Sequence, residues 1–118
     1  MRVQRLTRHA DFERVRTQGQ AHSTPLCVVF VARSPDTPAR IGVAAGKRIG
    51  SAVQRNRAKR LLREGARPLY TLIGPGWDIL LMARSPILDV KSTQVTAAIG
   101  SALRRLKVIV TSSESSPP

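Results

Sequence analysis

The residues with the clearest chemical meaning form a cationic cluster in the middle of the chain. Seven of the twenty Lys and Arg side chains lie between positions 47 and 64, and Glu64 is the only carboxylate among them. Arginine far outnumbers lysine in the whole chain, and its planar guanidinium favours bidentate contacts with phosphate oxygens. The cluster therefore predicts binding of a polyanion, with a solvated basic surface as the alternative interpretation.

Residues that could support catalysis are few and scattered. The seven Asp and Glu residues form no cluster suited to holding two metal ions for phosphodiester cleavage. Cys27 is the only cysteine, which excludes a disulfide within the chain and a thiolate metal cage. His9 and His22 are the only imidazoles, and a two-histidine nuclease is the one catalytic hypothesis left open. The residues favour a binder of phosphodiesters and predict no catalytic and no metal-ligating residue.

The cationic cluster is predicted to lie on an amphipathic helix. At about 100° per residue, one face is apolar and carries Ala58, Leu61, Leu62, Gly65 and Leu69. The neighbouring face carries Arg55, Asn56, Lys59, Arg60, Arg63 and Arg67. Ser51 is the expected N-cap, and Pro68 is expected to kink or end the helix. Because like charges four residues apart destabilise an isolated helix, we expect an anion outside the helix to offset their repulsion.

The elements around this helix are predicted from periodicity and turn chemistry. Thr7 or His9 is the expected N-cap of a first helix that reaches about Gln18, with Gly19 as a left-handed residue after its end. Apolar runs predict strands over 26–33, 40–45 and 77–84, with a shorter strand over 21–24. The turn at 34–38 predicts an antiparallel hairpin between the first two of these strands. Apolar spacing predicts a last helix over 95–106.

Composition limits the class of protein. A chain of 118 residues fits one domain, expected over 1–110, and residues 111–118 have the composition of a disordered tail. The net charge of +13 indicates a partner with dense negative charge, of which nucleic acid is the commonest. No apolar run approaches the roughly 20 residues that span a bilayer, and no signal peptide is evident. We therefore expect a cytoplasmic protein that does not bind membranes.

The order of elements bears on the kind of nucleic acid. It lacks the paired helices of a helix-turn-helix, and no zinc-finger or zipper spacing is present. Only four aromatic residues are available for base stacking, so stacking cannot be the main mode of binding. Phe12 and Phe30 could together form one small cleft for an extended single strand, although core packing is an equal interpretation of both. These observations favour RNA.

Two segments of the chain resemble the signature of the bacterial ribonuclease P protein subunit. They are Arg40-Ile41-Gly42-Val43 and the run from Gly46 to Glu64, whose centre is Arg55-Asn56-Arg57 followed by Lys59-Arg60. The resemblance extends from Asp11-Phe12 in the first helix to Ser85-Pro86 and covers about residues 5 to 107. Arg16 departs from the pattern, because an aromatic residue is common there in the family.

The resemblance implies a fold and a function. The fold would be α+β, a two-layer α/β sandwich in the order helix, strands, helix, strand, helix, with a four-stranded sheet and a left-handed crossover. The function would be to assist a catalytic RNA that removes the 5′ leader of precursor tRNA, with the chemistry and the Mg²⁺ ions belonging mainly to the RNA. No obligatory protein partner is implied. A general RNA-binding or ribosomal protein remains the alternative.

The resemblance also assigns residues to two surfaces. The residues expected to face the catalytic RNA are Lys47, Arg48, Arg55, Asn56, Arg57, Lys59, Arg60 and Arg63. The residues expected to form a cleft for the leader of the precursor tRNA are Phe12, Arg16, Phe30, Val43 and Ala45. With Arg16 in place of an aromatic side chain, this cleft is expected to contact leader phosphate where other members stack on a base.

Overall fold

A five-stranded sheet forms the centre of the molecule, in the strand order β1-β4-β5-β3-β2. The computed structural model describes residues 3–35 and 37–109, so the tail predicted over 111–118 lies outside the described residues. The strands are β1 (Gln4–Arg5), β2 (Gln20–Ser23), β3 (Cys27–Arg33), β4 (Arg40–Ala44) and β5 (Trp77–Ala83). The helices are α1 (His9–Gln18), α2 (Ala52–Ala66) and α3 (Ser92–Arg105), with short 3-10 turns η1 (Lys47–Ile49), η2 (Arg67–Leu72) and η3 (Ser85–Asp89).

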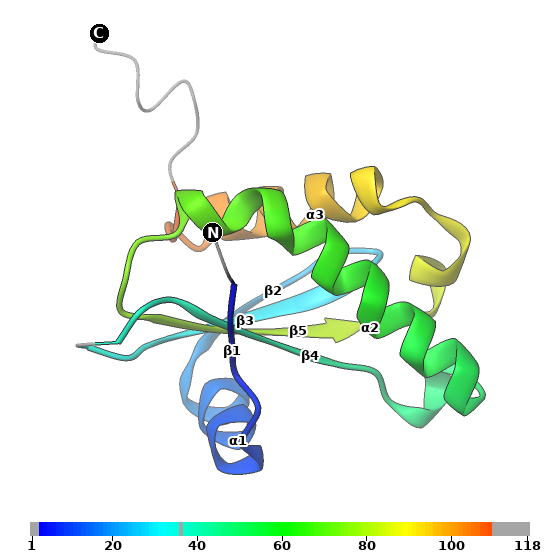
Figure 1. The fold of residues 1–118 in the computed structure, drawn as a ribbon, viewed down its shortest axis with the longest axis horizontal. Helices are drawn as coiled ribbons and strands as arrows, with labels where there is room; N and C mark the ends of the chain where they lie inside the picture. Colours follow the sequence, from blue (N-terminus) through cyan, green and yellow to red (C-terminus); the bar gives the residue numbers. More distant parts are fainter. Residues whose placement is uncertain (1–2, 36, 110–118) are drawn as a thin grey trace, which may run out of the picture.

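The helices lie on both faces of the sheet. Helices α2 and α3 cover one face, and α1 lies alone against the other (Figure 1). The alternation of side chains along β3 explains this division, because Val29 and Val31 join the large core under α2 and α3, whereas Phe30 joins a small core under α1. The predicted α+β sandwich is confirmed, and the two-residue strand β1 adds a fifth strand to the four that were expected.

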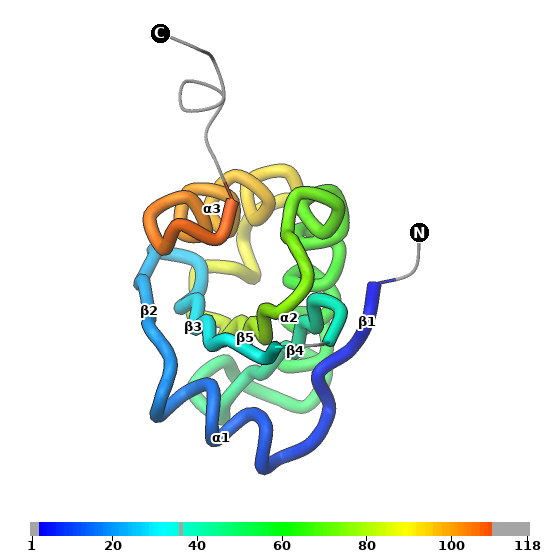
Figure 2. Tube along the Cα trace, turned by 90° about the vertical axis from the view of Figure 1, so that its left-hand side faces the viewer, coloured from blue at the N-terminus to red at the C-terminus, as the bar shows by residue number. Residues whose placement is uncertain are grey.

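The predicted hairpin between β3 and β4 is wrong, because β5 lies between them. Strand β5 pairs antiparallel with β3 and parallel with β4. The turn at 34–38 reverses the chain, but β5 is buried along most of its length and takes the central place, where β3 and β4 pair with its two backbone edges and helices cover its faces. The connection from β4 through α2 to β5 is left-handed, as the two views of the chain show (Figures 1 and 2). This hand is rare for parallel strands.

The start and end of α2 agree with the sequence. The Ser51 hydroxyl accepts a hydrogen bond from the Gln54 backbone N–H at 3.2 Å, and the Gln54 side chain accepts one from the Ser51 N–H at 2.8 Å. This is a capping box, and it satisfies two backbone donors at the helix start. Gly50 precedes it at φ 135°, a conformation that side chains disfavour. Helix α2 ends at Ala66, two residues before Pro68.

The ends of α1 differ from the prediction. Arg8 is the N-cap and makes no side-chain capping bond, so neither Thr7 nor His9 takes that place. Gly19 has a φ of −85° and an extended conformation, because the chain passes from the helix directly into β2. A Cβ on Gly19 would lie 2.3 Å from the Val31 carbonyl oxygen, so the glycine is needed for close packing and not for a left-handed turn.

Gly65 allows α2 and α3 to pack closely. A Cβ there would lie 2.6 Å from the Val95 Cγ1 atom on α3, and the Thr96 hydroxyl donates a hydrogen bond to the Gly65 carbonyl at 2.7 Å. We expect Gly65→Ala to destabilise the protein by about 1–3 kcal/mol through overpacking, despite the higher helix propensity of alanine.

Gly100 on α3 offers a matched control for this prediction. Its added Cβ would meet no atom closer than 3.4 Å, so Gly100→Ala should stabilise the protein by up to about 1 kcal/mol. Urea unfolding of both variants measures the difference. Stabilisation by both substitutions would show that Gly65 has no packing role.

Candidate nucleic-acid interface

The cationic face of α2 is largely open to solvent. Its exposed members are Asn56, Arg57, Arg60 and Arg63, and Lys47 and Arg48 on η1 are exposed beside its N-terminal end. Arg55 and Lys59 are half-buried at the border of this face. The opposite side of the helix, with Ala58 and Leu62, is fully buried against the sheet and α3. The structure therefore brings the predicted cationic residues onto one surface.

This surface has no internal counter-charge. Within residues 3–35 and 37–109, the five ion pairs found involve only Arg14, Arg16 and Arg40 as cations, and none involves a residue of η1 or α2. Arg55 is the member with a structural contact, because its guanidinium donates a hydrogen bond to the Gly50 carbonyl at 3.0 Å. Uncompensated arginines along one helix face are suited to binding successive phosphates.

An apolar side chain lies within this cationic surface. Val53 is 78% exposed, and it lines a shallow hollow together with Asn56, Arg57 and Arg60. These four positions follow the spacing i, i+3, i+4 and i+7, which places them on one side of a helix. Val53 was not predicted as a site residue, because the residues of the helix were assigned only to one apolar and one cationic face. An exposed valine among arginines can contact a ribose or base while they bind phosphate.

The predicted cleft residues divide between the two faces of the sheet. Phe12 of α1 and Phe30 of β3 are half-buried in the small core with Val15 and Leu80. Val43 belongs to the large core under α2 and α3, and Ala45 packs against that same core. Val43 and Ala45 therefore lie on the opposite face of the sheet from Phe30, although Val43 and Phe12 line one groove at the sheet edge.

The period of two along a strand explains this division. Phe30 is level with Leu80 and Gly42, and the next row of the same face contains Val28, Met82 and Ala44. Ala44 and Met82 are half-buried beside Phe30 in the small core, so they are its neighbours on the face where the leader cleft was expected. Arg16 lies exposed on α1, where its guanidinium binds the Glu13 carboxylate at 2.7 Å.

A buried ion cluster fixes α1 to the sheet. Asp78 of β5 is fully buried and accepts hydrogen bonds from Arg40 on β4 at 2.8 and 2.7 Å, as well as from Arg14 on α1. Arg14 and Arg40 also lie near Asp11 on α1. The carboxylate thus joins three elements and sets the position of the helix that carries Phe12.

Two buried groups have shifted pKa values. Burial alone raises the pKa of Asp78, but hydrogen bonds and charges from Arg40 and Arg14 outweigh it and hold the pKa below its ordinary value. Burial raises the pKa of Cys27, whose thiol contacts the Thr24 hydroxyl. Cys27 therefore remains a packed thiol in β3, as its place in the apolar run predicted.

Comparison with known proteins identifies the family. The family model for ribonuclease P matches residues 1–107, which is nearly the whole chain. The chain belongs to the ribonuclease P protein family. Ribonuclease P protein components from Herpetosiphon aurantiacus and Roseiflexus sp. strain RS-1 are 37% and 38% identical to it, over 107 and 109 residues. The alignments cover 91% and 92% of this chain, and 87% and 89% of the relatives.

Solved structures agree with this assignment. The ribonuclease P protein of Staphylococcus aureus superposes with a TM-score of 0.77 at 28% identity, covering 92% of this chain and all of that one. The Thermotoga maritima ribonuclease P protein gives a TM-score of 0.74 at 25% identity, covering 86% and 96% of the two chains. Members of the ribonuclease P protein family support maturation of the 5′ end of tRNA. No helix in the described part of this chain is long and apolar enough to cross a membrane.

Proposed function

We propose that this ribonuclease P protein acts by binding a catalytic RNA through the cationic surface of η1 and α2. The observation that carries this proposal is the row of exposed arginines on α2, none of which pairs with a carboxylate of residues 3–35 or 37–109. Phosphates of a folded RNA would supply the missing negative charge, and release of their counterions would make binding depend strongly on salt.

Catalysis in this proposal belongs to the RNA, and Mg²⁺ ions would be held mainly by the RNA. The environment of the carboxylates supports this division of work. Of the seven carboxylates, Asp11, Glu13 and Asp78 each lie against an arginine, so the charges of these three are already engaged. The protein then contributes binding, orientation and charge, while metal-activated water attacks the phosphodiester.

The predicted leader cleft, at the surface where α1 meets the sheet, would hold the 5′ leader of precursor tRNA. It offers half-buried aromatic edges from Phe12 and Phe30, with Ala44 and Met82 beside them. Arg16 lies on the same helix as Phe12 and can bind phosphate if Glu13 releases it. An extended single strand, with bases on the apolar side chains and phosphates outward, suits such a surface.

Reconstitution tests the proposed function. The purified protein alone should leave precursor tRNA intact, and the protein with the catalytic RNA and Mg²⁺ should remove the 5′ leader. A general RNA-binding protein would instead bind unrelated structured RNAs equally well at matched salt. Cleavage by the protein without RNA, abolished in His9→Ala or His22→Ala, would favour the two-histidine nuclease and contradict the proposal.

A charge placed in the cleft tests the leader site. Ala44→Glu should weaken binding of precursor tRNA by the reconstituted complex by about fivefold to tenfold, because a carboxylate near phosphate costs about 1 kcal/mol. Binding of mature tRNA, which lacks the leader, should change little. Ala97→Glu places the same charge on the exposed side of α3 and serves as the control. An equal effect of both variants on precursor binding would place the leader elsewhere.

A further inference from the structure

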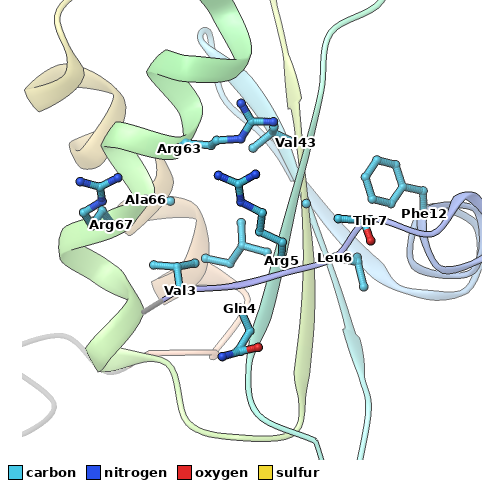
Figure 3. Close-up of a pocket in the computed structure, with 12 residues that line it drawn as sticks. Val3, Gln4, Arg5, Leu6, Thr7, Phe12, Val43, Arg63, Ala66 and Arg67 are labelled. Atoms are coloured by element: carbon cyan, nitrogen blue, oxygen red, sulfur yellow. The ribbon is translucent and has the colours of Figure 1, made fainter. Parts of the chain in front are cut away.

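A groove of about 850 Å³ runs along the edge of the sheet, between the N-terminal segment and α2. Its lining comes from β1 and the residues on either side of it, from Phe12 of α1, from β4, and from the C-terminal end of α2 with Arg67 just after it (Figure 3). Arg5, Arg63 and Arg67 are the charged residues of this lining, and Val3, Ile41 and Ala66 are among its apolar members. Of these arginines, only Arg63 belongs to the surface already assigned to RNA.

The short length of β1 creates the groove. Its two residues pair with β4, the Leu6 N–H donates to the Ile41 carbonyl at 3.0 Å, and the Gln4 N–H donates to the Tyr70 hydroxyl at 3.3 Å. Beyond Leu6 the chain leaves β4 for α1, so Gly42 and Val43 pair with β5 on one side, have no strand on the other side, and line the groove. The same bonds hold Arg5 at a fixed place on the sheet edge.

The alternation of side chains directs Arg5 toward α2. Val3 packs against the large core below α2 and α3, whereas Leu6 is buried in the small core below α1. Arg5 points to the same face of the sheet as Val3, because side chains two residues apart on a strand share a face. Its guanidinium turns toward Arg63 on α2, and Arg67 follows one helical turn after Arg63 (Figure 3). Arg5 was not predicted to belong to any site, because its closeness to α2 depends on the tertiary fold.

These three arginines have no protein partner for their charge. Across the described ranges 3–35 and 37–109, no carboxylate pairs with them and no side-chain hydrogen bond involves them. Arg67 follows α2 directly in a helical conformation, and its backbone N–H donates to the Arg63 carbonyl. The two guanidiniums are thus one turn apart, a spacing at which like charges repel. An anion between the strand and the helix would remove this repulsion, and the apolar floor suits a ribose or base next to a phosphate.

We propose that this groove binds a phosphodiester segment of the catalytic RNA, held by Arg5, Arg63 and Arg67. This inference rests on the proposed function, because the groove begins where the cationic surface of α2 ends and both share Arg63. The RNA backbone would thus continue from α2 around the open edge of β4. Phe12 of the predicted leader cleft also lines this groove, whereas Phe30, Ala44 and Met82 do not. The groove therefore adjoins that cleft at Phe12, and its arginines lie toward α2 (Figure 3).

Neutralising Arg5 and Arg67, the two groove arginines outside the cationic surface, tests the inference. At about 0.15 M salt, loss of one phosphate contact should weaken binding roughly fourfold and reduce the salt slope by about 0.7. Arg5→Gln and Arg67→Gln should each show this loss toward the catalytic RNA, and the double variant should lose roughly fifteenfold. Thermal unfolding should stay unchanged, because neither side chain makes an ion pair.

Two control variants separate this inference from the proposed function. Arg105→Gln removes an equal charge from the exposed side of α3 and should leave binding nearly unchanged. Arg57→Gln lies on the cationic surface and should weaken binding like Arg5→Gln. If only Arg57→Gln weakens binding, the groove is not an RNA site and the proposed function stands. If Arg57→Gln also behaves like Arg105→Gln, both proposals fail.

Discussion

Replacing Asp78 with asparagine is expected to destabilise the protein by about 3 kcal/mol, the largest effect of any single polar substitution considered for this chain. The side chain is fully buried, and the change leaves Arg14 and Arg40 without the carboxylate that binds them. Because both guanidiniums keep about a third of their surface exposed, solvent limits the cost to the lower end of the range for a broken buried pair. Urea unfolding at neutral pH measures this difference.

The pH dependence of the same variant gives a second measurement. The pKa of Asp78 is lowered in the folded protein, so its stabilising contribution is fully present above its unfolded pKa of about 3.9. It is lost as the pH falls through the lower folded pKa. The difference in unfolding free energy between wild type and Asp78→Asn should therefore be constant from pH 5 to 7 and shrink below about pH 4.

Glu13 provides the matched control for Asp78. It also binds an arginine, Arg16, but both side chains are about half exposed. Glu13→Gln should change stability little, because exposed ion pairs contribute little. If Asp78→Asn were no more destabilising than Glu13→Gln, the buried cluster would not fix α1 to the sheet.

Removing three charges from α2 is expected to have the largest effect on RNA binding. The variant Arg57→Gln/Arg60→Gln/Arg63→Gln should bind the catalytic RNA roughly sixtyfold more weakly at about 0.15 M salt, and its salt slope should fall by about 2. Neutralising these residues also removes like-charge repulsion along the helix, so the folded protein should be no less stable. Filter binding across a salt series and thermal unfolding measure the two effects.

A variant with the same loss of charge on α3 controls for the overall field of the protein. Arg104, Arg105 and Lys107 lie at the C-terminal end of α3 or just after it, and replacing all three with glutamine lowers the net charge equally. Binding should then fall by less than about threefold, since long-range attraction is screened at this salt. Equal losses for the two triple variants would show that total charge, and not the α2 surface, binds the RNA.

The cationic surface of α2 was predictable because the side of a helix on which a residue lies follows from its spacing to nearby residues. The spacing from Arg55 to Arg63 and the cap at Ser51 depend only on neighbours within about four residues. Leu62 and Ala58 are buried where the same spacing placed them. The family assignment also came from this segment, whose residue order is more specific than its charge.

It was harder to predict which strands pair and on which face of the sheet each side chain lies. The hairpin of β3 with β4 failed because the partner strand β5 lies more than thirty residues further along the chain. Val43 and Ala45 were assigned to the cleft because the face of a strand cannot be chosen until its neighbours are known. A one-residue difference then separates Ala44, which lies beside Phe30, from Val43, which lies on the opposite face.

Composition and short-range periodicity were enough to predict an uncompensated cationic helix and an RNA-binding protein, because both properties depend on neighbouring residues. How distant segments combine became visible only in the folded chain. Folding joined Asp78, Arg14 and Arg40 into one buried cluster, and it brought Arg5 next to α2 across the edge of β4. Such contacts depend on strand order and crossover hand, which arise from packing the whole chain around one sheet.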